Sequence, residues 1–137
     1  MNLAIAVAAY NRPACLTRLL GSLTRVRAPH GVYLIVSIDA GGPASVGEIA
    51  RGFRWPHGPV EVIEHKERLG LKGNILACGD LTEHHDAVIV LEDDLYASPE
   101  LVEYARQAVD FYADDPSVGG ISLYSPVHNE IPLLAFP

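Results

Sequence analysis

Short, almost wholly apolar runs alternate with helix-like segments along this chain of 137 residues, and no other feature narrows the choice of fold so much. The runs have the length and composition of buried strands and lie at residues 3–8, 32–38, 60–63, 87–91 and 118–124. A strand that is apolar on both faces needs cover on both faces. We therefore expect an α/β fold, a Rossmann-like and mostly parallel sheet with helices on both faces.

The segments between these runs place apolar residues at helical spacing. Asn11 is a candidate cap for a first helix, in which Leu16, Leu19, Leu20 and Leu23 share one face. Three further helices are expected. A short one contains Val46, Ile49, Ala50 and Phe53, and a second one, over residues 72–81, turns Ile75, Leu76 and Cys78 inward. Ser98 caps the last helix, which has Pro99 in its first turn and an apolar stripe of Leu101, Ala105, Ala108 and Tyr112.

Length and composition indicate one globular domain over residues 1–137, since 49% of the residues are hydrophobic and 20% are charged. The net charge of −7 argues against nucleic acid as the main partner, because a phosphate backbone is bound through a basic face.

No apolar run approaches the roughly 20 residues that span a bilayer, and the first residues lack the basic start of a signal peptide. We expect a cytoplasmic protein with membrane contact that is at most peripheral. Cys15 and Cys78 are expected to be buried free thiols.

Polar residues follow several of the predicted strands where each one ends. Residues 10–12 (Tyr-Asn-Arg) follow the first strand, Asp39 follows the second, and residues 92–94 (Glu-Asp-Asp) follow the fourth. Ligands of parallel sheets bind outside the carboxyl ends of the strands. The sequence therefore predicts one site at this edge of the sheet.

Three well-known α/β sites do not fit. The loop after the first strand reads AAYNRPA and lacks the glycines of a dinucleotide site, and no GxxxxGK[ST] phosphate loop is present. A phospho-acceptor receiver domain would place paired acids after its first strand and a lysine after its fifth strand, and neither is found.

Four blocks in order resemble those of a nucleotide-sugar-dependent glycosyltransferase with the GT-A fold: IAVAAYNRPACLTRLLGSL, LIVSIDAGG, LGLKGNILACGDL and VIVLEDDLYASPELVEY. The chain is similar to family 2 enzymes and to the N-acetylglucosaminyltransferase I type, whose DxD motif has the form EDD. The likeness extends from Leu3 to about Tyr124. It implies a metal-dependent, inverting transfer of a sugar from a nucleotide-diphosphate donor, a UDP-sugar by preference, to an acceptor hydroxyl.

By this resemblance, Asp94 is a direct ligand of Mn²⁺ or Mg²⁺, Asp93 faces the ribose or the metal's waters, and Glu92 touches the donor sugar. Such a hard cation prefers oxygen ligands and can bridge a carboxylate to both phosphates. It also stabilises the leaving diphosphate as a Lewis acid. The alternative for the three acids is a solvated strand end.

Asp39 is the candidate for reading the base. A carboxylate can accept the imide N–H of uracil or thymine, or the N1–H and N2–H₂ pair of guanine, whereas adenine and cytosine offer no equivalent ring N–H. This chemistry narrows the nucleotide without choosing it, and the resemblance to the family favours UDP, with dTDP and GDP behind it. The alternative is an aspartate that only stabilises the turn before AGG.

The resemblance also places the first loop, from Ala9 to Arg12, against the base and ribose. Tyr10 is a candidate for stacking on the base. Asn11 could contact the ligand, cap the helix or do both, and Arg12 could contact a phosphate or face solvent.

A basic stretch, EHKERLGLKGN, contains Lys66, Arg68 and Lys72, which can counter the diphosphate or face solvent. Lys72 stands where the family's helix commonly begins ARN. The neighbouring pair His84 and His85 lacks the spacing of zinc ligands, and a polar turn is the better interpretation.

The general base that would deprotonate the acceptor is not apparent. Glu130 is the one late acid, in a proline-flanked segment. We expect the acceptor side to be truncated and the base to lie beyond Pro137, with a glycan, lipid or protein as acceptor. Two alternatives are a nucleotide-sugar-binding module without catalysis and a nucleotidyltransferase. The nucleotidyltransferase is disfavoured, because it would need a glycine- and arginine-rich loop after the first strand.

Overall fold

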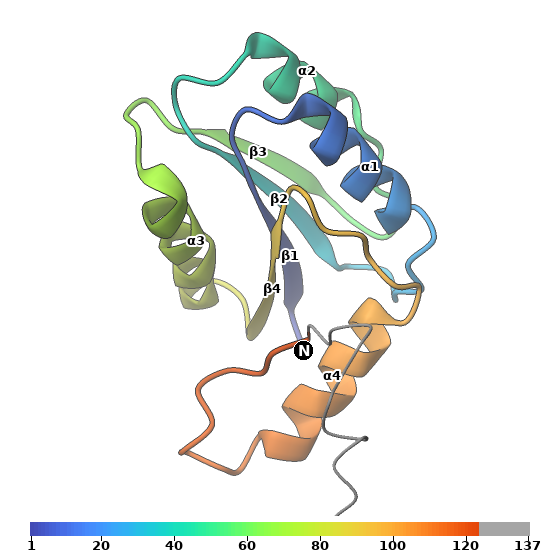
Figure 1. Cartoon of the computed structure of the whole chain (residues 1–137). Coiled ribbons are helices and arrows are strands. Elements are labelled where there is room, and N and C mark those ends of the chain that lie inside the picture. Colours follow the sequence, from blue (N-terminus) through green and yellow to red (C-terminus); the bar gives the residue numbers. More distant parts are fainter. Residues whose placement is uncertain (124–137) are drawn as a thin grey trace, which may run out of the picture.

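The structure is a computed structural model, and it describes residues 1–123. Strands and helices alternate along the chain, as the apolar pattern predicts (Figure 1). Their bounds are β1 Leu3–Ala9, α1 Pro13–Leu23, β2 Tyr33–Ile38, α2 Ala44–Gly52, β3 Val60–Glu64, α3 Gly70–Asp80, the short 3₁₀ helix η1 Leu81–Glu83, β4 Ala87–Glu92 and α4 Leu101–Tyr112.

The strands form one sheet in the order β3-β2-β1-β4, and each neighbouring pair in it is parallel. The central strand β1 pairs Ala9 with Ile38 of β2 and Ala8 with Glu92 of β4. The carboxyl ends of these three strands therefore lie side by side. The parallel α/β fold expected from the sequence is confirmed.

Helices cover both faces of the sheet, with α1 and α2 on one side and α3 on the other (Figure 1). Ile5 and Val7 of β1 are fully buried in the core that includes α1, α2 and α4. The next residues along, Ala6 and Ala8, face Cys78 of α3. Alternation along β1 thus places large side chains toward α1 and α2 and small side chains toward α3.

The fifth strand predicted at residues 118–124 is wrong over the part that the structure describes, because residues 118–123 form no strand. Gly119 and Gly120 are exposed, and two glycines in succession cost backbone entropy while offering no side chain to pack. Leu123 nevertheless packs against the core. Tyr124 lies outside the described residues.

The start of α1 also differs from the prediction. Its N-cap is Arg12, and no side chain caps it, so Asn11 is not a cap. Pro13 occupies the first turn instead, where a residue without an N–H leaves one fewer donor to satisfy.

The α4 helix begins later than predicted, with Glu100 as its N-cap and Pro99 outside it. The Ser98 hydroxyl accepts the Glu100 N–H at 3.3 Å, so it stabilises the turn that leads into the helix.

On α3, Ile75 is partly buried and Cys78 is fully buried, but Leu76 is 56% exposed. The prediction for Leu76 was wrong because Asn74, one turn before Cys78, takes the inward position. Cys15 and Cys78 are free thiols, although Cys15 is only half-buried. Within residues 1–123, no helix combines the length and the apolar character needed to cross a membrane.

Leu19→Ala is expected to lower the free energy of unfolding by about 2–5 kcal/mol, because it leaves a cavity beneath α1. Leu76→Ala, on the exposed face of α3, should cost less than about 0.5 kcal/mol. Urea denaturation followed by circular dichroism measures both changes. If Leu76→Ala lowered the free energy of unfolding as much as Leu19→Ala does, the exposed position of Leu76 on α3 would be contradicted.

Candidate functional site

The backbone at the end of β1 places the first residues of two site loops. The Asp39 N–H donates to the carbonyl of Ala9 at 2.9 Å, and the Asp93 N–H donates to the carbonyl of Ala8 at 3.2 Å. The parallel ladder thus continues one residue past β2 and past β4. As a result, Asp39 and Asp93 lie on opposite sides of the end of β1.

A cavity of about 200 Å³ opens at this edge of the sheet. Loops after β1, β2 and β4 and the start of α3 line it with both polar and apolar side chains. The lining residues are Ala8, Ala9, Tyr10, Asn11, Arg12, Asp39, Arg68, Gly70, Leu71, Asn74, Glu92 and Asp93. The structure therefore brings together most of the residues that the sequence singled out. Asp94 and Lys72 are not among the lining residues.

The Asp39 carboxylate caps α3. One oxygen, Oδ1, accepts the N–H groups of Ala40 at 2.9 Å and Leu69 at 2.7 Å, and Oδ2 accepts that of Gly70 at 2.9 Å. Burial by itself would raise the pKa of Asp39, but these three amides and the nearby Arg68 outweigh it and lower the pKa. An ionised carboxylate has roughly four acceptor positions. Oδ2 therefore keeps one for a further donor.

Tyr10 lies between Arg68 and the glycine loop after β2. The Arg68 guanidinium is 4.3 Å from the centre of the Tyr10 ring, and its Nη1 donates to the Tyr10 hydroxyl at 2.5 Å. Gly41 has a positive φ of 88°, and a side chain at Gly42 would collide with the Tyr10 carbonyl. Gly41 is thus required for its backbone conformation, whereas Gly42 is required because it lets the loop pack closely against Tyr10.

The acidic end of β4 is held by arginines from the first loop and from α1. Nη1 of Arg12 donates to Asp94 Oδ2 at 2.8 Å, and Nη2 of Arg12 lies 2.5 Å from Asp93 Oδ1. Arg18 donates to the backbone carbonyl of Asp94 at 2.6 Å. Burial by itself would lower the pKa of Arg12, but the two carboxylates raise it. Glu92 is exposed at the rim of the cavity.

Asp93 is the exception among the buried polar groups of this edge. Its side chain is only 3% exposed, yet Oδ1 accepts no well-aligned hydrogen bond from any residue in the range 1–123. The short contact with Arg12 is an ion pair in which no N–H points at the oxygen. A buried acceptor without a donor is costly. This oxygen is therefore suited to a cation or to a further donor.

A divalent cation fits these residues if a ligand completes its coordination. Within the described part of the chain, no three acidic, histidine or cysteine side chains converge as a ready-made metal site. Mg²⁺, however, is usually held by one or two carboxylates together with substrate phosphates. The carboxylate oxygens of Asp93 and Asp94, both of which now face Arg12, match that second kind of site.

A buried network beneath the cavity was missed in the sequence. The Ser37 hydroxyl donates to Asn74 Oδ1 at 2.6 Å and lies 2.8 Å from His65 Nε2. The Asn74 amide donates to the carbonyls of Ala9 and Ser37 at 3.2 Å and 3.1 Å. Asn74 therefore ties α3 to the ends of β1 and β2. The signal that could have revealed it is a polar residue one turn before the buried Cys78.

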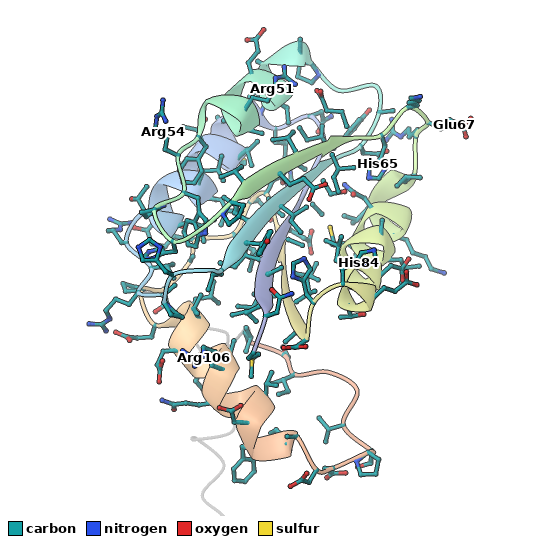
Figure 2. All side chains as sticks on the ribbon, turned by 180° about the vertical axis from the view of Figure 1, so that it is seen from behind. Arg51, Arg54, His65, Glu67, His84 and Arg106 are labelled. Carbon is teal, nitrogen blue, oxygen red and sulfur yellow. The ribbon has the colours of Figure 1, made fainter. Side chains whose placement is uncertain are left out.

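The remaining predicted polar residues lie away from the cavity. Lys66 and Lys72 are exposed and do not line it. Figure 2 shows His65 near the N-terminal end of α3, and His84 at the opposite end of that helix. His84 and His85 form the polar turn predicted there, and both of their N–H groups donate to the Leu81 carbonyl.

Comparisons with known proteins agree with this fold. The family model described as "Glycosyl transferase family 2" matches residues 4–135. TarS of S. aureus, in its crystal structure of residues 1–349, has a TM-score of 0.65 at 19% identity over 89% of this chain and 38% of its own. A comparison with curated protein sequences finds no match.

Two solved complexes have the same fold. TarS with UDP-GlcNAc has a TM-score of 0.63 at 19% identity, covering 82% of this chain and 32% of its own. The mannosyltransferase PcManGT from Pyrobaculum calidifontis, with GDP-Man and Mn²⁺, has a TM-score of 0.61 at 20% identity, covering 86% of this chain and 34% of its own. The chain thus spans about a third of the length of these structures. The likeness to the N-acetylglucosaminyltransferase I type stays a prediction.

Asp39→Asn is expected to lower the free energy of unfolding by about 1–3 kcal/mol at pH 7, because an amide oxygen cannot replace both charged acceptors. The lowered pKa of Asp39 means that its contribution is full above the unfolded pKa and is lost as the pH falls through the folded value. The gap between wild type and variant should therefore narrow below about pH 4.

Urea denaturation from pH 7 to pH 2.5 measures this gap, with Asp80→Asn at the exposed end of α3 as the matched control. An Asp39→Asn variant as stable as the control at pH 7 would show that the three amides do not depend on this carboxylate.

Proposed function

This chain belongs to glycosyl transferase family 2, and we propose that it binds a nucleotide-diphosphate sugar as the donor for glycosyl transfer to an acceptor hydroxyl. A UDP-sugar is favoured, a divalent cation takes part, and the transfer proceeds with inversion. The observation that carries this proposal is the cavity at the ends of β1, β2 and β4, which brings the base-reading candidate Asp39 together with Glu92 and Asp93.

The base would bind on the side of the cavity formed by Asp39 and Tyr10. The remaining acceptor position on Oδ2 suits the imide N–H of uracil, and it also suits an N–H of guanine. The solved complexes with UDP-GlcNAc and GDP-Man support a diphosphate sugar donor on this fold and leave both bases open. Tyr10 lines the cavity and would stack on the base, beside Arg68, which lies over its ring. Ala9 and Asn11 would complete the base and ribose contacts.

The diphosphate would lie toward the acidic end of β4. Asp94 would hold Mn²⁺ or Mg²⁺, with Asp93 beside the ribose or the metal's waters and Glu92 toward the donor sugar. When bound, the cation neutralises charge on the leaving diphosphate. Arg12 is placed to contact a phosphate, and Lys72 on the first turn of α3 would approach from outside the cavity.

The acceptor would be a glycan, a lipid or a protein, and no lining residue is assigned as its general base. We propose that residues 1–137 form the nucleotide-sugar-binding part of the fold. A cytoplasmic location, peripheral to a membrane at most, is part of the same proposal. The alternative is a binding module that holds the donor without turnover.

Isothermal titration calorimetry with UDP, dTDP and GDP, each with and without Mn²⁺, tests donor binding by the chain. We expect UDP to bind more tightly with Mn²⁺, and ADP and CDP to bind weakly. Asp94→Ala should weaken the Mn²⁺-dependent binding at least about tenfold, since even outer-shell changes at metal sites cost 10–100-fold.

The matched control is Asp110→Ala, which removes an exposed acid from α4. Equal binding of ADP and UDP would rule out the assignment of Asp39, and indifference to Mn²⁺ would rule out that of Asp94. Release of UDP from a UDP-sugar would distinguish an enzyme from a binding module.

A further inference from the structure

One guanidinium bridges the two aspartates at the end of β4. Arg12 reaches Asp94 Oδ2 with Nη1 at 2.8 Å and Asp93 Oδ1 with Nη2 at 2.5 Å. The Asp93 side chain is 3% exposed, whereas that of Arg12 is 46% exposed. A buried carboxylate is therefore neutralised by a half-exposed cation that comes from the opposite loop of the cavity.

Other cations of the described chain do not share this role. Arg18 contacts the backbone carbonyl of Asp94, and Arg68 is paired with Tyr10. Lys66 and Lys72 do not line the cavity. Without Arg12, the buried Asp93 carboxylate would lose its ion pair, and a buried charge without compensation is strongly unfavourable.

Arg12 and a divalent cation compete for the same two carboxylates. Arg12 occupies Oδ2 of Asp94 and Oδ1 of Asp93, and a metal held by either aspartate would lie about 4 Å from the guanidinium, where the two cations repel strongly. We propose that Arg12 is a built-in counter-cation that must leave the aspartates before a metal binds, and that the diphosphate then becomes its new partner. This inference deepens the proposed function, since it concerns the same acidic edge.

The local structure allows the exchange without a change of fold. The backbone of Arg12 is fixed, because its carbonyl accepts the Leu16 N–H at 3.0 Å and Pro13 follows it in the first turn of α1. Rotation of the side chain alone would carry the guanidinium from the aspartates toward the cavity that Arg12 already lines. The planar fork of arginine suits a diphosphate as well as a pair of carboxylates.

This exchange predicts a coupling between the two ligands. Metal alone must displace Arg12 with no compensation, so it binds weakly. When a diphosphate is present, the displaced guanidinium gains a partner, and each ligand strengthens the binding of the other.

Electron paramagnetic resonance of free Mn²⁺ tests the proposal on the chain in the absence of nucleotide. Arg12→Gln should bind Mn²⁺ at least about tenfold more tightly than wild type, because the competing cation is gone. The control Arg54→Gln removes one exposed positive charge that does not line the cavity, so its affinity should stay within about twofold of wild type. Equal affinities of Arg12→Gln and Arg54→Gln would overturn the proposal.

Arg12→Lys covers the case in which Arg12→Gln does not fold. A lysine keeps the charge but cannot bridge two carboxylates with a planar fork, so this variant should bind Mn²⁺ more tightly than wild type but less tightly than Arg12→Gln. An affinity equal to that of wild type would count against the exchange.

Addition of UDP then separates this inference from the proposed function. UDP should raise the affinity of wild type for Mn²⁺ by a larger factor than that of Arg12→Gln. Tighter Mn²⁺ binding by Arg12→Gln with no binding of UDP would support the competition between Arg12 and the metal and overturn the proposed donor.

Discussion

The backbone at the carboxyl end of β1 is the constraint on which the rest of the site depends. The carbonyl of Ala8 holds Asp93, and the carbonyl of Ala9 holds both Asp39 and the Asn74 side chain. Two loops and one helix are therefore fixed on consecutive peptide groups of the central strand. The side chains around the cavity differ in chemistry, but their positions have this common origin.

Polar groups buried at this edge are satisfied by one another, with one exception. Asp39 binds the amides that begin α3, and Ser37 and Asn74 bind each other. These hydrogen bonds hold the architecture in place, and Asp39 Oδ2 keeps one acceptor position besides. Asp93 is different, since its buried Oδ1 faces a charge but receives no aligned N–H. The contrast separates the residues that build the site from the one whose environment is left incomplete.

Much of the fold and of the site edge could be predicted from the sequence, because parallel strands buried on both faces leave long apolar runs. The lack of strand structure at residues 118–123 could not be predicted from apolar residues alone, since it depends on Gly119 and Gly120. The same limit applies to α3, where a buried Asn74 turned Leu76 outward. The capping role of Asp39 joins residues 30 positions apart, so no local pattern contains it.

The position of β1 between β2 and β4 has a consequence for the order in which the protein can form. β2 and β3 follow β1 early in the chain, but the β4 partner of Leu3 is Ala87. A chain emerging from the ribosome could pair the first three strands while one edge of β1 stayed open. Closing that edge joins distant residues, which is slow compared with local pairing. The acidic edge needs β4 paired with β1, so we expect it to form after β1, β2 and β3 have paired.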